Sequence, residues 1–142
     1  MTPARITGEF KVAEANSLRG GRACVRLLEP LEYRVGSAES GETIVVPAGF
    51  LTDFASIPWG LWNLFPPLGP WARPAIIHDF LYATRGDGWA FQRCWITRER
   101  PYARAEADAI FREAMRVVGV DAWRREVMYR AVRLGGGGGW GS

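Results

Sequence analysis

The chain has 142 residues, of which 48% are hydrophobic and 23% are charged, and this composition is typical of one globular domain. A chain of this length buries roughly two thirds of its unfolded surface, so neither disulfides nor a structural metal are required for folding. The formal net charge is only +3 and the arginines are scattered along the chain, which argues against a specific nucleic-acid interface.

The cysteine content and the hydropathy of the chain indicate the cellular compartment in which the protein is expected to fold. Cys24 and Cys94 are the only cysteines, so there is neither a disulfide framework nor a CxxC ligand pair. The first residues lack the apolar core of a signal peptide, and no apolar run is long enough to cross a bilayer. We therefore expect reduced thiols, no transmembrane segment and synthesis in the cytoplasm.

The first half of the chain is predicted to form β-strands. Apolar and β-branched runs occur in "RACVRLLEPLEYRV" (22–35) and "GETIVVPAGF" (41–50), and the Gly and Ser residues between them suit a hairpin loop. "ITGEFKVAEA" (6–15) adds a short edge strand.

A segment rich in proline, glycine and large aromatic residues follows, over residues 47–74. Because it is not polar, it is predicted to be an ordered loop in the middle of the domain, not a linker. Its Trp59, Trp62 and Trp71 side chains have three alternative uses: a lipid contact, a subunit contact, or an aromatic cluster that covers the helices.

The second half is predicted to be helical. Pro74 suits the first turn of a helix that stops near Gly86. The next helix ends at Gly119, and a third, "DAWRREVMYRAVRLGG", is capped by Asp121. The second helix carries the clearest apolar stripe, formed by Ala107, Ile110, Phe111, Ala114, Met115 and Val118.

These elements predict an α+β fold, in which a small antiparallel sheet packs on a pair of antiparallel helices, with a C-terminal helix that braces them. The helix pair is expected to meet across His78 and Asp108. Residues 1–134 form a single domain in this prediction, and residues 135–142 form a flexible glycine-rich tail.

The segment "AIIHDFLYATRG" contains the only histidine of the chain, His78. On a helix, Tyr82 shares a face with His78, whereas Asp79 is turned by about 100°. An imidazole base beside a cation-binding carboxylate suits the activation of water. Asp108 is the expected orienting partner of His78, with Tyr82 donating to the same carboxylate. The alternative is that these residues only form a buried polar network.

The order "HDFLY" followed by "ADAIF" resembles the two-helix core of phospholipase A2 enzymes, whose first helix carries a His-Asp-x-x-Tyr motif. This resemblance implies that His78 is the general base and that Asp79 is a calcium ligand. It also implies that Tyr82 and Asp108 support the base.

Those enzymes place a glycine-rich calcium loop before the His helix, and here that position is occupied by "GFLTDF". Backbone oxygens near Gly49 and Leu51, with the carboxylate of Asp53, would replace the loop as ligands. The expected cofactor is a divalent cation. Calcium is preferred, because it prefers oxygen ligands, and zinc is the second choice if Asp53, His78, Asp79 and Asp108 converge on one point.

A second resemblance covers nearly the whole chain. In order and spacing, "VPAGFLTDFASIPWGLW", "AIIHDFLY", "ADAIFREAMRVVGV" and "MYRAVRLGG" are similar to a family of bacteriophage and prophage proteins catalogued as domain of unknown function 1353. The signature residues of that family correspond here to Asp53 with Ser56, His78 with Asp79, and Asp108. The resemblance implies a phage origin but no established activity.

The function expected from these observations is a phage-encoded, metal-dependent hydrolase of phospholipase A2 type that acts on a phospholipid or another cell-envelope substrate. One alternative is a non-catalytic phage component, such as a tail or baseplate subunit or a lysis accessory, that contacts phage structural proteins. A further alternative is a metal-assisted peptidoglycan hydrolase. The expected location is the host cytoplasm, and association with the virion is left open.

Overall fold

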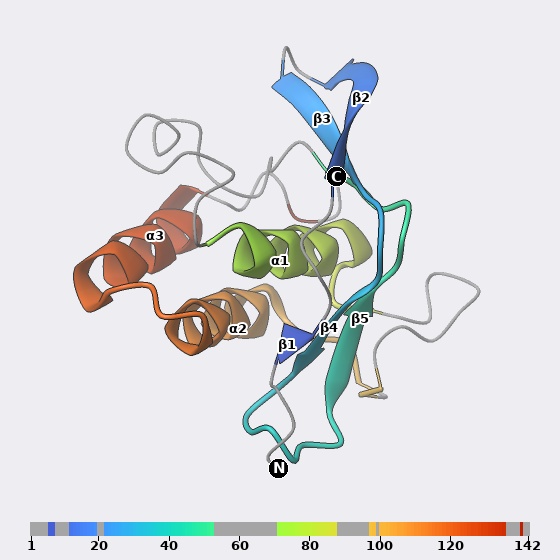
Figure 1. Cartoon of the computed structure of the whole chain (residues 1–142). Coiled ribbons are helices and arrows are strands. Elements are labelled where there is room, and N and C mark those ends of the chain that lie inside the picture. The colour runs from blue at the N-terminus through green and yellow to red at the C-terminus, as the bar shows by residue number, and fades with distance from the viewer. Residues whose placement is uncertain are drawn as a thin grey trace.

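The computed structural model describes residues 6–7, 12–19, 22–52, 71–87, 97–98, 100–135 and 140. These residues form short antiparallel strands followed by three helices (Figure 1). The strands are β1 (Ile6–Thr7), β2 (Val12–Arg19), β3 (Arg22–Leu27), β4 (Leu31–Arg34), β5 (Thr43–Val46) and β6 (Leu51–Thr52). The helices are α1 (Ala72–Thr84), α2 (Arg104–Val117) and α3 (Ala122–Gly135).

The predicted α+β class is confirmed, and the strands divide between two small sheets. One sheet has the order β1-β4-β5 and the other has the order β2-β3-β6. Pro30 lies between β3 and β4, and a proline has no N–H to donate to a strand ladder. In β4 and β5 alternate side chains are buried, and these are Leu31, Tyr33, Ile44 and Val46.

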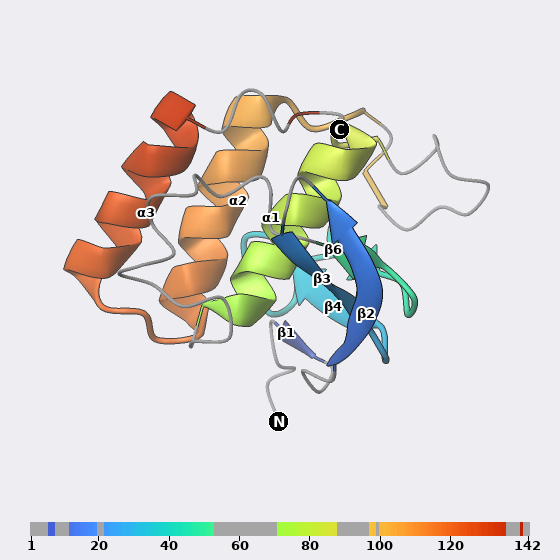
Figure 2. The ribbon, with the colours of Figure 1, turned by 90° about the horizontal axis from the view of Figure 1, so that it is seen from above.

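Helix α1 is the centre of the fold. In Figure 2 the helices lie side by side in the order α3, α2, α1, and the strands lie beyond α1. Helix α1 contacts α2 on one side and strands β4 and β5 on another. Its side chains are therefore buried on nearly every face. Pro74 lies in the first turn, as predicted.

The turn after α1 places α2. The backbone is left-handed at Arg85 (φ 53°) and at Gly86 (φ 71°). The Gly86 carbonyl accepts the Tyr102 N–H at 3.0 Å. A Cβ on Gly86 would lie 2.2 Å from the Tyr102 carbonyl oxygen, so only glycine allows this approach. The close contact holds the residues that precede α2 against the end of α1.

Helix α2 runs antiparallel to α1 and presents its apolar stripe to it. Ala107, Ile110, Phe111, Ala114 and Met115 are buried, and Val118 is half-buried. At the start of α2 the Glu106 carboxylate accepts the Ala103 N–H at 3.1 Å. Gly119, with φ 88°, follows the end of the helix as predicted.

Helix α3 packs against the other side of α2. Figure 2 shows it at the outer edge of the helix layer. Its last residue is Gly135, and Trp140 in the predicted tail makes an edge contact with the Tyr82 ring at 5.0 Å. The domain boundary and the flexibility of the tail stay predictions.

Candidate functional site

The His78 imidazole and the Asp108 carboxylate face each other across α1 and α2. Nε2 of His78 lies 2.7 Å from Oδ1 of Asp108, and neither side chain has exposed surface. The Tyr82 hydroxyl, one turn after His78, donates to the same Oδ1 at 2.6 Å. The structure thus brings together the three residues that the sequence nominates for catalysis.

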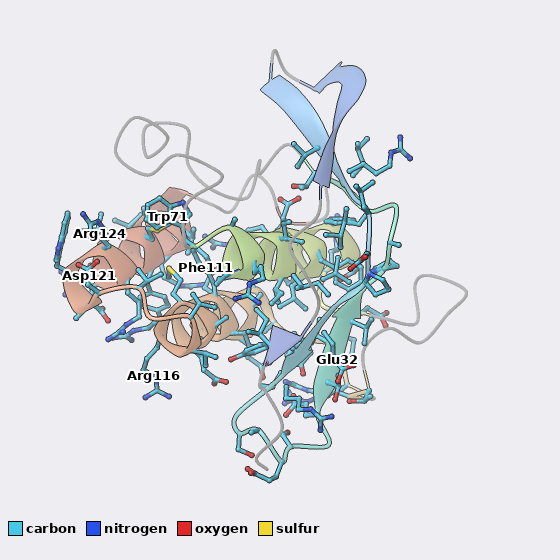
Figure 3. The ribbon with its side chains drawn as sticks, viewed as in Figure 1. Glu32, Trp71, Phe111, Arg116, Asp121 and Arg124 are labelled. Atoms are coloured by element: carbon cyan, nitrogen blue, oxygen red, sulfur yellow. The ribbon has the colours of Figure 1, made fainter. Side chains whose placement is uncertain are left out.

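Two aromatic rings contact the imidazole. The centroid of the Tyr82 ring lies 4.3 Å from that of His78, and the Phe111 centroid lies at 4.6 Å. Phe111 comes from the apolar stripe of α2, labelled in Figure 3 at the junction of the helices. These contacts restrict the rotation of the ring and keep Nε2 directed at Asp108.

Two arginines that the sequence reasoning missed complete the network. Arg133 of α3 donates to Oδ2 of Asp108 at 2.7 Å. Arg104 of α2 donates to the Tyr82 hydroxyl at 3.1 Å, and to the carbonyls of Val132 and Arg133 at 2.9 Å each. The signal that could have found them is the charge of Asp108, because a buried carboxylate needs a cation as well as neutral donors.

Burial and hydrogen bonds set the charge states of the pair. Burial lowers the pKa of His78, and this effect outweighs the opposing influence of Asp108 and Asp79. Burial alone would raise the pKa of Asp108, but hydrogen bonds from His78, Tyr82 and Arg133 bring it below its usual value. At neutral pH the pair is therefore a neutral imidazole beside a carboxylate. Nε2 donates its proton to Asp108, and Nδ1 is the basic nitrogen.

Asp79 points to a different part of the fold. Its Oδ2 accepts a hydrogen bond from the Thr52 hydroxyl at the end of β6. The rings of Phe50 and Phe80 meet edge to face at 5.4 Å, so the strand end that carries Thr52 lies against the middle of α1. This arrangement agrees with the helical turn of about 100° between His78 and Asp79.

Two of the other predicted cation ligands, Gly49 and Leu51, belong to the segment before Thr52. Gly49 has φ 90° and donates its N–H to the Leu27 carbonyl at 2.7 Å, and Leu51 pairs with Arg26 in the sheet. Both therefore lie on the strand end that approaches Asp79. Asp53 and Ser56 lie outside the described residues, as do Trp59 and Trp62.

The side-chain oxygens at Asp79 are of the kind that binds a hard cation. The Asp79 carboxylate and the Thr52 hydroxyl both offer oxygen, which calcium prefers. Within the described part of the chain, no three His, Cys, Asp or Glu side chains gather as a metal site would require. The cation stays a prediction that involves Asp53.

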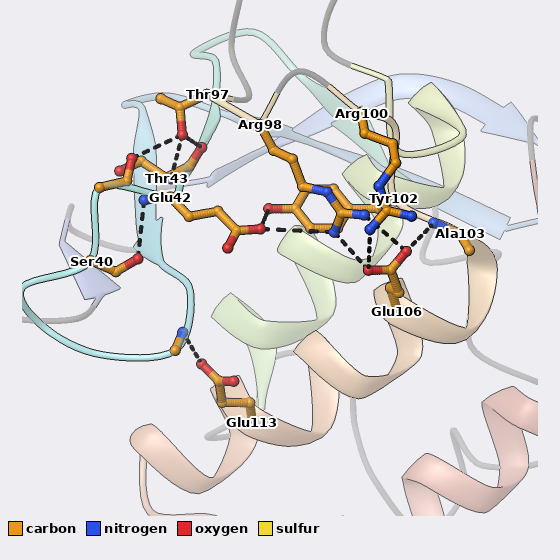
Figure 4. A network of polar contacts seen from close by, with 12 residues as sticks. Ser40, Glu42, Thr43, Thr97, Arg98, Arg100, Tyr102, Ala103, Glu106 and Glu113 are labelled. Atoms are coloured by element: carbon orange, nitrogen blue, oxygen red, sulfur yellow. Dashed lines mark hydrogen bonds and ion pairs between the residues drawn. The ribbon is translucent and has the colours of Figure 1, made fainter.

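A second polar network lies at the start of α2, away from the predicted residues (Figure 4). Arg98 makes two hydrogen bonds to Glu106, at 2.6 and 3.1 Å, and the Tyr102 hydroxyl donates to Glu42. A hollow of about 500 Å³ adjoins this network, lined by Gly41, Glu42, Thr97, Arg98 and Arg100. It contains none of the residues nominated from the sequence.

Comparison with known families supplies a classification. The profile of the family described as "Protein of unknown function (DUF1353)" matches residues 25–132. The chain belongs to this family. The match includes His78, Asp79, Tyr82 and Asp108, whereas Arg133 lies one residue beyond its end. No curated protein and no solved structure matches the chain. Among the described residues, no helix has the length and apolar character needed to span a membrane.

Proposed function

We propose that this DUF1353 protein is a phage-encoded hydrolase of phospholipase A2 type, in which His78 activates water for attack on an ester. The observation that supports the proposal is the 2.7 Å contact between His78 Nε2 and Asp108 Oδ1. Because Nε2 donates to Asp108, Nδ1 is the nitrogen that accepts a proton in the proposed reaction. The helical pitch turns the neighbouring Asp79 away from this pair, toward the Thr52 hydroxyl.

The proposed reaction needs one base that later acts as an acid. His78 Nδ1 takes a proton from water while the water oxygen bonds to the ester carbonyl carbon. The imidazolium then returns the proton to the leaving alkoxide oxygen as the carbon–oxygen bond breaks, which releases a fatty acid and a lysolipid. The Asp108 carboxylate stabilises the imidazolium, and Tyr82 and Arg133 hold that carboxylate in place.

The predicted calcium ion would be held by Asp79 and Asp53, with backbone oxygens near Gly49 and Leu51. When bound, such a cation polarises the ester carbonyl. Calcium is favoured over zinc because the donors near Asp79 are oxygens, whereas His78 is engaged with Asp108.

A second candidate function is favoured by burial. His78 and Asp108 have no exposed surface, and every described partner of Asp108 comes from one of the three helices. Such a network can hold three helices together without any chemistry, as in a non-catalytic phage component. Catalysis requires a conformation in which water and substrate reach Nδ1, whereas the structural role requires none.

The experiment that separates the two uses the single histidine. Diethyl pyrocarbonate, followed at 240 nm, reports directly on His78, while fatty-acid release from mixed phospholipid vesicles in calcium is measured on the same protein. The hydrolase predicts that His78 is modified, that modification abolishes release, and that His78→Gln lowers release at least about 100-fold.

The control is Asp121→Asn, which changes an exposed carboxylate outside the network and should leave release unchanged. Asp79→Asn should abolish saturable calcium binding in calorimetry. An unmodified His78 and no lipid turnover, with a lower melting temperature for His78→Gln, would reject the hydrolase in favour of the structural role.

A further inference from the structure

Helix α3 has two apolar faces. Met128 and Val132 are fully buried against the rest of the molecule. On the opposite side Trp123, Val127 and Leu134 are 61%, 40% and 89% exposed. Large apolar side chains at these exposures on one helix require an explanation, because isolated exposed residues are common but an aligned set is not.

The three exposed residues form one stripe. At 100° per residue, positions 123, 127 and 134 fall within about 40° of one another, and on the far side from Val132. They extend over about 16 Å of helix at 1.5 Å per residue. Figure 2 shows α3 at the outer edge of the helix layer, with α2 on its other side. The stripe formed by these three exposed side chains is hereafter called the outer α3 face.

The outer α3 face also lies on the basic part of the protein. The chain has 18 basic and 15 acidic residues. Helix α3 contains four of the basic residues and one of the acidic residues, so the rest of the chain has fourteen of each. The formal net charge of α3 is therefore +3, but Arg133 is paired with Asp108 and Arg124 with Asp121, so Arg130 contributes most to the basic character of the outer α3 face. Arg130 is exposed between Val127 and Leu134, and the Arg124 guanidinium lies 4.7 Å from the Trp123 ring (Arg124 is labelled in Figure 3).

We propose that the outer α3 face binds the surface of an anionic phospholipid membrane. An amphipathic helix with Trp, Leu and Val on one face and arginines beside them lies in the interface plane, with its apolar side chains at the acyl boundary and its guanidinium groups at the phosphates. A second copy of the chain is disfavoured as the occupant, because two faces of net positive charge repel each other. The inference does not depend on hydrolase activity.

The test is co-sedimentation of the full chain with vesicles. The wild type should bind vesicles of phosphatidylcholine with 30% phosphatidylglycerol, a composition chosen as roughly that of an anionic leaflet. It should bind pure phosphatidylcholine much more weakly. Leu134→Glu should lower the partition coefficient at least about tenfold, and Arg130→Gln should lower it several-fold.

The matched control is Leu28→Glu, which places the same charge on an exposed leucine (50%) outside α3. Its binding should equal that of the wild type. The proposal is overturned if the wild type does not bind anionic vesicles, or if Leu28→Glu and Leu134→Glu weaken binding equally. It is also overturned if light scattering shows a dimer that Val127→Glu dissociates, because the face then binds a second copy.

Discussion

Two carboxylates on α2, only two residues apart, have opposite environments. The Glu106 side chain is 38% exposed and is held by Arg98 and the Ala103 N–H. The Asp108 side chain is fully buried and accepts hydrogen bonds from His78, Tyr82 and Arg133. Within the part of the chain that the structure describes, each carboxylate accepts three hydrogen bonds, two of those to Glu106 coming from Arg98.

The two carboxylates differ in whether water can replace a hydrogen-bond partner that is removed. Water can solvate Glu106 when an arginine leaves, so the net value of its ion pair is small. No water reaches the buried Asp108, so removal of either side leaves an unpaired polar group in a low-dielectric environment. The same number of hydrogen bonds is therefore expected to have very different energetic weight.

The largest expected effect is that of Asp108→Ala. It leaves His78, Tyr82 and Arg133 without their acceptor, and the loss of one member of a buried charged network costs about 3–5 kcal/mol. Urea denaturation followed by tryptophan fluorescence measures the change. The matched substitution Glu106→Ala should cost less than about 1 kcal/mol, and equal costs for the two would show that burial is not the deciding factor.

A smaller effect is expected for Tyr82→Phe. The substitution keeps the ring against His78 but removes the hydroxyl that donates to Asp108, and hydrogen bonds to charged groups contribute about 1.5–3 kcal/mol. Tyr102→Phe is the counterpart, because its hydroxyl donates to the partly exposed Glu42. Thermal unfolding of both variants should show the greater loss for Tyr82→Phe, and the reverse order would contradict the comparison.

The hydrogen bonds of Glu106 should affect the free energy of unfolding at acid pH. Hydrogen bonds from Arg98 and from the Ala103 N–H lower the pKa of Glu106 to about 2, from 4.5. A lowered pKa stabilises the fold above pH 4.5, and this contribution is lost as the pH falls from 4.5 toward 2. Glu106→Gln should therefore flatten the pH dependence of unfolding in that window. An unchanged slope between pH 4.5 and 2 would mean that the Arg98 pair has no influence on folding.

The smallest effect is expected at the exposed pair between α2 and α3. Arg112 lies 2.5 Å from the Glu126 carboxylate, and its guanidinium lies 4.7 Å from the Tyr129 ring. Arg112→Ala should cost at most about 1 kcal/mol in urea denaturation, and 1 M salt should reduce the cost further. A loss as large as that of Asp108→Ala would show that this pair holds α3 in place.

Local geometry explains which parts of the site could be predicted. The pitch of a helix places His78 and Tyr82 on one face and turns Asp79 away, and both expectations hold. Pro74 lies in the first turn of α1, because proline fixes φ at a helical value. Gly119 follows the end of α2, because glycine adopts a positive φ without strain. The α+β class follows from the change in residue pattern along the chain.

The sequence by itself therefore determined the helices and the faces of their polar residues, and the resemblance of its "HDFLY" and "ADAIF" segments to a known helix pair indicated that His78 meets Asp108. Only the tertiary structure decided that Arg104 and Arg133 complete the network, that Thr52 meets Asp79, and that the strands divide between two sheets. The physical reason is the separation of the contacting residues along the sequence. Helical pitch relates neighbours in the chain, whereas Arg133 reaches Asp108 only because α3 packs on α2, and no local pattern records that contact.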